Sequence, residues 1–121
     1  YLTSKLENGT YSMYHQQYQM ALKLFTDIIK EDPKWAEGWN KRATLLFIMG
    51  NYEKSLDDIE KVLDLEPRHF GALSGRAQIY LSYKQYEKAI DDLRKAKSIY
   101  PLIKSGENIR LIEKIIKEQQ I

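Results

Sequence analysis

The stretch NYEKSLDDIEKVLDLEP at residues 51–67 returns in altered form as QYEKAIDDLRKAKSIYP at residues 85–101, 34 residues further along the chain. The three prolines, Pro33, Pro67 and Pro101, keep the same spacing. Small residues and tyrosines recur in the same register: Gly9, Ala43 and Ala77, and Tyr18, Tyr52 and Tyr86. A fixed period of this length indicates a repeat protein, in which each unit stacks on the next.

Within each repeat the apolar residues follow the period of an α-helix. Tyr52, Leu56 and Ile59 lie three or four residues apart, which places them on one face of a helix. Gly50 can supply the left-handed residue that ends one helix and turns into the next. Proline closes the repeat because the residue before it is disfavoured in helical dihedrals. The predicted helices span residues 4–15, 18–31, 36–49, 52–65, 70–83, 86–99 and 105–119.

Small columns beside large ones are typical of helices that cross closely. One helix pair cannot bury its apolar stripe, whereas three stacked pairs can, and the end of the stack then needs a cap. In the last predicted helix, Ile109, Ile112 and Ile116 share the inward face. The sequence therefore predicts an all-α fold in a single domain over residues 1–121. Its parts are repeats at 2–35, 36–69 and 70–103 and a capping helix at 104–121.

Composition limits the classes of function. The chain has 121 residues, and its 19 Lys and Arg against 17 Asp and Glu give a net charge of only +2, so no nucleic-acid partner is expected. Without cysteine it has no disulfide and no thiolate metal ligand. No apolar run approaches the roughly 18 residues that a membrane span needs. A soluble, cytoplasmic protein is the default expectation, and export is expected only if a targeting segment precedes Tyr1.

The residues that carry catalysis in other proteins do not form a pattern here. His15 and His69 stand apart from any carboxylate or cysteine at metal-ligand spacing. No glycine loop for phosphate, nucleophile elbow or zinc spacing occurs. We therefore expect no enzyme activity, no catalytic residue, no cofactor and no metal.

Charged residues also recur with the repeat. Asp57 and Asp58 return as Asp91 and Asp92. Because adjacent residues on a helix point about 100° apart, we interpret both pairs as a solvated polar face. Arg42 and Arg76 also recur at this spacing, and we interpret them as structural residues that partner acidic groups between repeats.

These features together resemble the tetratricopeptide repeat family. The second repeat matches the family pattern at Trp39, Ala43, Gly50, Tyr52, Ser55, Val62 and Pro67. The third repeat has Lys84 in place of the turn glycine, at a cost of about 1 kcal/mol in a left-handed turn. The first repeat departs in its first helix, where Lys5 and Asn8 replace an aromatic residue and a leucine. The resemblance implies a right-handed superhelix, an α-solenoid, whose first helices line a concave groove.

Family members mostly bind peptide segments or partner helices in that groove. Helix geometry then gives the groove-facing positions, and Met13 is predicted to be one of them. The candidate binding residues are Tyr14, Asn40, Lys41, Thr44, Phe47, Ser74, Gln78 and Ser82. Asn40 and Gln78 can each donate to and accept from a peptide backbone, and Lys41 can hold a carboxylate. The alternative is that these positions are merely solvated and the partner binds elsewhere.

Three functions are consistent with a helical repeat fold of this kind. The favoured one is a scaffold or adaptor that binds a protein or peptide in the groove. The alternative is a structural module that self-associates weakly end to end, burying Ile115, Ile116 and Ile121 of the cap. RNA binding is not expected, because Lys41 is the one basic residue among the groove positions.

Some relatives hold the C-terminal carboxylates of heat-shock chaperones in a clamp of lysines, asparagines and an arginine. In this chain none of the five corresponding columns holds the residue that the clamp has at that column; the second repeat, for example, has a lysine where the clamp has an asparagine. The five columns hold Leu6, Thr10, Lys41, Gly71 and Gly75. Such a ligand would lose most of its charge-assisted hydrogen bonds, so we expect that this chain is not a chaperone carboxylate clamp.

Overall fold

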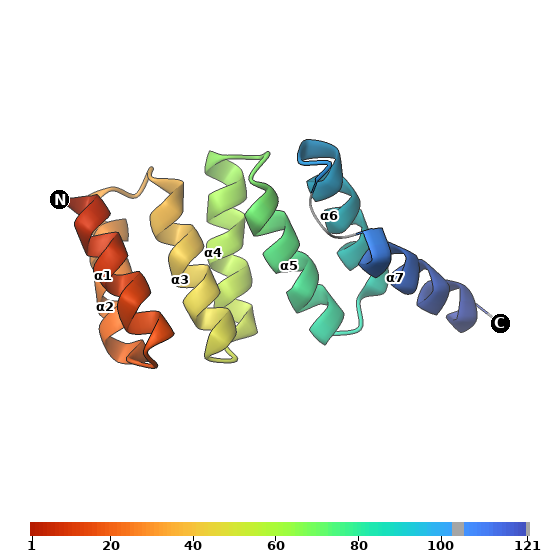
Figure 1. Cartoon of the computed structure of the whole chain (residues 1–121), viewed down its shortest axis with the longest axis horizontal. Helices are drawn as coiled ribbons and strands as arrows, with labels where there is room; N and C mark the ends of the chain where they lie inside the picture. Colours follow the sequence, from red (N-terminus) through yellow and green to blue (C-terminus); the bar gives the residue numbers. More distant parts are fainter. Residues whose placement is uncertain (103–105, 121) are drawn as a thin grey trace. The chain divides into compact units, whose positions relative to one another are not determined.

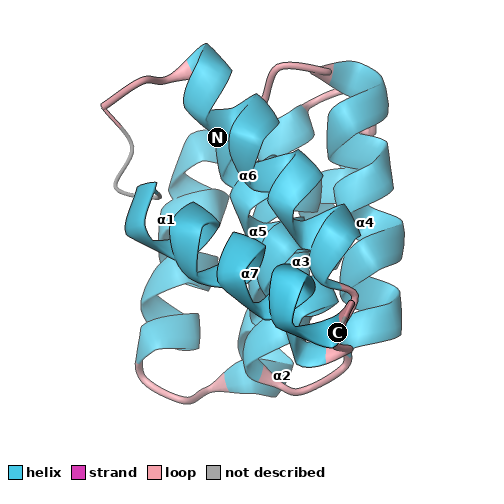
Figure 2. Cartoon of the chain, turned by 90° about the vertical axis from the view of Figure 1, so that its right-hand side faces the viewer, coloured by secondary structure: helices cyan, strands magenta, loops and turns pink. Residues whose placement is uncertain are grey.

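The computed structural model describes residues 1–102 and 106–120, with the side chains of the last helix described from residue 108. Helices and the turns between them make up these residues, and no strand occurs among them (Figures 1 and 2). The helices are α1 (Leu2–Tyr14), α2 (Tyr18–Glu31), α3 (Ala36–Ile48), α4 (Tyr52–Leu65), α5 (Phe70–Ser82), α6 (Tyr86–Ile99) and α7 (Gly106–Gln119).

The predicted all-α class is confirmed, and the helix bounds agree with the predicted ones to within two residues. The largest difference is at α1, which begins at Leu2 instead of residue 4. The predicted start of the last helix at residue 105 lies outside the described residues, and α7 begins at Gly106. Each repeat is an antiparallel helix pair: α1 with α2, α3 with α4, and α5 with α6 (Figure 1).

Contacts along the backbone divide the chain into two compact units, Tyr1–Pro67 and Arg68–Ile121. The first unit holds the first two repeats, and the second holds the third repeat and α7. Each unit has a hydrophobic cluster of its own. The organisation of residues 1–121 as a single domain stays a prediction.

The cluster of the first unit, the first core, lies where α1 and α3 pack on α2. Its centre is Phe25, which is fully buried, together with Ile28 and Leu45. Met13 belongs to the same cluster and is 2% exposed. Its prediction as a groove-facing residue is therefore wrong, because the packing of α1 on α2 turns this side chain inward. Gly9 provides the close contact, since a Cβ atom there would lie 2.5 Å from Cε1 of Phe25.

The cluster of the second unit, the second core, joins α5, α6 and α7. Ala77 and Ala89 are fully buried in it, as expected of small residues at a close helix crossing. Ile109 and Ile112 of α7 are buried in the same cluster, and Ile116 packs against it. The predicted inward face of the last helix is confirmed.

The recurring arginines form ion pairs with buried carboxylates. Arg42 donates from Nε and Nη2 to the two carboxylate oxygens of Asp58, at 2.8 and 2.9 Å. Arg76 makes the same bidentate pair with Asp92, at 2.8 and 2.8 Å. Both pairs join the two helices of one repeat, so the prediction of acidic partners between repeats is wrong. Arg42 reaches the preceding repeat through Thr26, whose Oγ1 lies 3.4 Å from its Nη1.

The adjacent carboxylates therefore have different environments. Asp58 and Asp92 are 4% and 6% exposed, whereas Asp57 and Asp91 are exposed. Their common interpretation as a solvated face is wrong for the second aspartate of each pair. The rotation of about 100° between neighbours on a helix directs that carboxylate at the arginine of the first helix and its neighbour at solvent.

The turns inside the three repeats place a left-handed residue at the same position. The φ angles are 58° at Gln16, 81° at Gly50 and 58° at Lys84. The left-handed turn predicted at Gly50 and at Lys84 is confirmed. Gln16 and Lys84 adopt this conformation without the freedom of glycine, which costs each about 1–2 kcal/mol.

Candidate functional site

In the first unit the candidate residues lie on the first helices of the two repeats, α1 and α3, which contact each other. This surface is called the α1–α3 face. Tyr14 is 65% exposed at the end of α1. Asn40, Lys41 and Phe47 are half-buried on α3, and Thr44 is exposed. The structure therefore brings an aromatic ring, an amide, an ammonium group and a hydroxyl to accessible positions of this unit.

The hydroxyl groups of this face are already used within their own helices. Thr10 Oγ1 donates to the carbonyl of Leu6 at 2.8 Å, and Thr44 Oγ1 donates to the carbonyl of Asn40 at 3.1 Å. Such bonds to the preceding turn are common for helical threonine. Because each hydroxyl proton is engaged, Thr44 can offer a ligand only the lone pairs of its oxygen.

Asn40 and Lys41 differ from these hydroxyls. Over residues 1–102 and 106–120, neither side chain forms a hydrogen bond or an ion pair. The amide of Asn40 can both donate and accept, and the ammonium group of Lys41 can donate three hydrogen bonds. Phe47 instead packs on Tyr52 of α4, with ring centroids 5.3 Å apart, so part of its ring is engaged inside the repeat.

In the second unit the candidate residues lie on α5. Gln78 is exposed, and its amide has no partner among the described side chains. Ser82 Oγ donates to the carbonyl of Gln78 at 3.1 Å. The Ser74 hydroxyl is buried and forms no hydrogen bond within the described structure. Of these three side chains, Gln78 is the one that presents free donor and acceptor groups to solvent.

The two histidines have local structural contacts. His15 stacks on Tyr11 with ring centroids 3.9 Å apart, and its Nδ1 lies 2.8 Å from the Tyr11 carbonyl oxygen. Nδ1 of His69 accepts a hydrogen bond from the backbone N–H of Ala72 at 3.0 Å and so caps the start of α5. In the part of the chain that the structure describes, no three His, Asp or Glu side chains gather as a metal site. None of its helices is both long and apolar enough to span a bilayer.

At the N-terminal end of the first unit, Lys5 lies 3.1 Å from the Tyr1 hydroxyl and 3.5 Å from Oε1 of Glu31. The hydrogen bond with Tyr1, followed by the attraction of Glu31, raises the pKa of Lys5. This ammonium group is held between α1 and α2, whereas that of Lys41 is not engaged.

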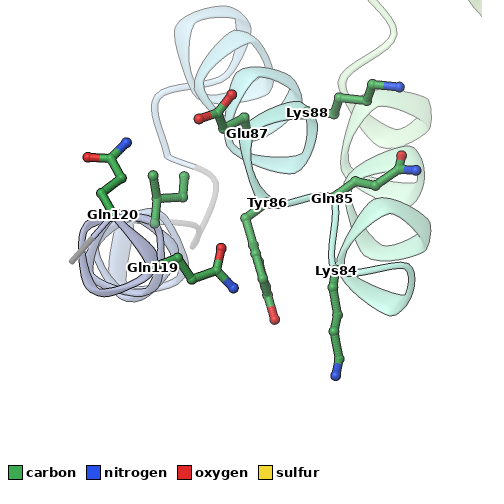
Figure 3. Close-up of a pocket in the computed structure, with 8 residues that line it drawn as sticks. Lys84, Gln85, Tyr86, Glu87, Lys88, Gln119 and Gln120 are labelled. Atoms are coloured by element: carbon green, nitrogen blue, oxygen red, sulfur yellow. The ribbon is translucent and has the colours of Figure 1, made fainter.

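A cleft between α6 and α7 was not anticipated from the sequence. Two adjoining hollows of about 330 and 360 Å³ share Glu87, Ile116 and Gln120 in their lining. Figure 3 shows Tyr86 in this cleft, with Gln119 of α7 on one side and Lys84 on the other. Sequence periodicity predicts the helix α7 but not how α7 packs across α6. The cleft lies between the two helices as a result of that packing.

Comparison with known proteins agrees with this repeat organisation. Models of the tetratricopeptide repeat family match residues 36–69 and 71–101. These ranges hold the second and third helix pairs and together make up more than half of the chain.

Two curated proteins match parts of the chain. A TPR repeat-containing protein of Rhizobium etli is 60% identical over 53 residues, which are 44% of this chain and 26% of that protein. Hsp70-Hsp90 organizing protein 1 of Glycine max is 34% identical over 61 residues, which are 50% of this chain and 11% of that protein. The chain thus matches only a minor part of the length of either relative.

Solved structures share the fold at low sequence identity. The first TPR domain of Spaghetti (RPAP3), bound to the HSP90 peptide SRMEEVD, has a TM-score of 0.88 at 19% identity, over 96% of this chain and 93% of that one. The Sgt2 TPR domain of Aspergillus fumigatus has a TM-score of 0.87 at 18% identity, over 98% and 81%. These likenesses establish the all-α fold built from repeated helix pairs.

Proposed function

Because the chain belongs to the tetratricopeptide repeat family, we propose that it is a non-enzymatic protein–protein interaction module that binds a peptide segment or helix of a partner protein. The proposed binding surface is the α1–α3 face in the first unit and the α5 face, centred on Gln78, in the second. An extended or helical segment is the usual ligand of such helical surfaces.

The observation that carries this proposal is the state of three polar side chains. Asn40, Lys41 and Gln78 have no partner among the described residues, whereas Thr10, Thr44 and Ser82 are bonded within their own helices. A free amide can pair with the N–H and C=O groups of a peptide backbone, and the free ammonium group can pair with a carboxylate. Tyr14 adds an exposed ring at the end of α1.

The experiment is affinity capture from the native cell with the wild-type chain and with the triple variant Asn40→Ala, Lys41→Ala, Gln78→Ala. Proteins lost with the triple variant are identified, and their binding segments are synthesised and titrated against both forms. We expect the triple variant to bind such a segment at least about tenfold more weakly, because several hydrogen bonds near the centre of an interface are lost.

The matched control is a triple alanine variant on the second helices, at Glu60, Asp64 and Lys95, which are all exposed. It alters an equal number of polar side chains and should keep the affinity. Equal binding by the wild-type chain and the Asn40, Lys41, Gln78 variant would show that the proposed face is not the binding surface.

We further propose that the ligand is not a chaperone C-terminal tail held by a carboxylate clamp. Among the five clamp positions, Lys41 is the one cation, and Gly71 and Gly75 offer no side chain. Leu6 packs against the first core, and the Thr10 hydroxyl proton is bonded to the Leu6 carbonyl. Two carboxylates of a chain end would therefore meet one positive charge.

The peptide SRMEEVD, seen bound to the Spaghetti domain, provides the test. Fluorescence anisotropy with the labelled peptide should show no saturable binding in the micromolar range. Saturable micromolar binding that is lost when the C-terminal carboxylate is amidated would refute the proposed exclusion and would leave the choice of face to the alanine variants.

Self-association is the second candidate function, and one feature of α7 favours it. Leu111 is 58% exposed, and Ile115 and Ile116 are half-buried on the same helix. Sedimentation velocity over a range of concentrations should detect a dimer that Leu111→Lys dissolves. A monomer at every concentration would remove this candidate.

A further inference from the structure

A hollow of about 470 Å³ lies in the first unit between the second helices, α2 and α4, with α3 as its floor. The α3 residues that line it are Trp39, Arg42 and Leu46. Because each residue of a helix is rotated by about 100°, Arg42 points roughly 200° away from Asn40. The hollow is therefore on the side of α3 opposite the α1–α3 face.

The floor of this hollow is apolar and firmly held. Leu22, Trp39 and Leu46 line it, and Leu22 also packs against the first core. The Trp39 indole donates to the carbonyl of Pro33 at 2.8 Å. The Arg42 guanidinium lies 5.3 Å from the centre of the Trp39 ring. A ring fixed in this way gives an apolar side chain of a partner a rigid surface to pack on.

The charge of Arg42 is already balanced at the floor. Its guanidinium makes the bidentate pair with Asp58, and its Nη1 lies 3.4 Å from Thr26. Any net charge that a partner protein meets must therefore come from the side chains around the edge of the hollow, which we call its rim.

The rim carries an excess of positive charge. Lys54 and Lys61 of α4 are seven residues apart and line the hollow, so two helical turns place them on one side of the helix. An adjoining hollow of about 380 Å³ shares Leu22 and Thr26 and extends along α2. Lys23 and Lys30 of α2 line this extension, again seven residues apart.

These four ammonium groups are exposed, and within the described residues none of them forms an ion pair. Two carboxylates lie in the same linings, the exposed Asp57 of α4 and the half-buried Asp27 of α2. Four lysines against two aspartates leave an excess of two positive charges around an apolar floor. A partner that fits must present carboxylates around an apolar side chain.

We propose that this hollow docks an acidic segment of a partner protein, with one apolar side chain on the floor made by Leu22, Trp39 and Leu46, and with carboxylates opposite the lysines of α2 and α4. This surface is separate from the α1–α3 face, so the chain would hold two segments at once. Charge complementarity of this kind sets the encounter rate and the orientation, and the buried anchor slows dissociation.

The probe is a fluorescein-labelled synthetic peptide with aspartates and glutamates on both sides of a single leucine. Anisotropy titration should give saturable binding that weakens as salt is added. Lys54→Glu with Lys61→Glu should weaken binding by about tenfold or more, and Lys54→Gln with Lys61→Gln should weaken it less. A peptide with serine in place of leucine should bind more weakly to the wild-type chain. Asp57→Asn should strengthen binding a few-fold, since it removes the carboxylate between the two lysines.

The matched control is Lys95→Glu with Lys97→Glu on α6, where both side chains are exposed, and it should leave binding unchanged. Asp91→Asn repeats the charge change of Asp57→Asn in the third repeat and should have no effect. The variant Asn40→Ala, Lys41→Ala, Gln78→Ala should still bind the acidic peptide, which separates this test from that of the proposed function. Circular dichroism checks that each variant keeps its helices.

Three outcomes would overturn the proposal. In the first, the wild-type chain shows no saturable binding of the peptide. In the second, Lys54→Glu with Lys61→Glu and the control Lys95→Glu with Lys97→Glu weaken binding equally, so that only overall charge matters. In the third, a single-stranded oligonucleotide binds through Lys54 and Lys61 while the peptide does not, which would assign the surface to nucleic acid.

Discussion

Gly9 shows how a single small residue controls the packing of the first unit. A methyl group on its Cα would lie 2.5 Å from the ring of Phe25, which is fully buried, so the ring or the backbone would have to shift. Gly9→Ala should therefore lower the free energy of unfolding by about 1–3 kcal/mol, even though alanine favours helix. Urea denaturation followed by circular dichroism measures this change. The exposed neighbour variant Asn8→Ala should lose no stability, and equal behaviour of the two variants would contradict the packing argument.

The adjacent aspartates allow a second prediction at the scale of the residue. Asp58→Ala removes the partner of Arg42 and leaves a partly buried guanidinium unpaired, so we expect a loss of about 2 kcal/mol or more. Asp57→Ala alters an exposed carboxylate one position away and should change stability by no more than about 0.5 kcal/mol. Chemical denaturation measures the free energy of unfolding of both variants. Similar losses would mean that the ion pair contributes little to stability.

The turns provide a prediction at the scale of the element. The second repeat has Gly50 in the left-handed position and Asn51 as N-cap, whose Oδ1 accepts from the backbone N–H of Lys54 at 3.4 Å. The third repeat has Lys84 at φ 58° and Gln85, which forms no side-chain cap. Glycine at position 84 would remove the backbone strain of the left-handed conformation, and asparagine at position 85 would add a side-chain cap at the start of α6.

We expect Lys84→Gly with Gln85→Asn to raise the free energy of unfolding by about 1 kcal/mol. The corresponding pair in the first repeat, Gln16→Gly with Gln17→Asn, should act in the same direction. Lys84→Ala is the control, because alanine is also disfavoured at positive φ and should give no gain. Thermal melting distinguishes these cases, and a double variant no more stable than Lys84→Ala would refute the role of the left-handed residue.

At the scale of the whole molecule, the two units should differ in how they respond to local damage. Each has its own core and its own arginine–aspartate pair, and repeat proteins lose structure unit by unit. Hydrogen exchange with mass spectrometry should show that Gly9→Ala speeds exchange in α1–α3 more than in α5–α7. Ile112→Ala, in the second core, should show the reverse. Equal acceleration in both units by either variant would mean that the chain opens as one cooperative unit.

The repeats, the helices and the left-handed turns at Gly50 and Lys84 were all predicted correctly from local sequence patterns. Helix ends depend on neighbours within a few residues, namely a turn residue and a proline, so a 34-residue period predicts them directly. The inward face of α7, with Ile109 and Ile112, followed from the same periodicity. The candidate binding positions on α3 and α5 also came from the period, and their role in binding stays a prediction.

Tertiary packing was needed to show which individual side chains the neighbouring helices cover. It placed Met13 in the first core and buried the Ser74 hydroxyl. It also paired Asp58 with Arg42 and left Asp57 in the lining of an open hollow. The physical reason is that helix formation depends on hydrogen bonds between residues four apart, whereas burial depends on the crossing of helices that are distant along the chain. A rotation of about 100° separates the buried carboxylate from the exposed one, and the repeat period does not show which of the two faces the neighbouring helix.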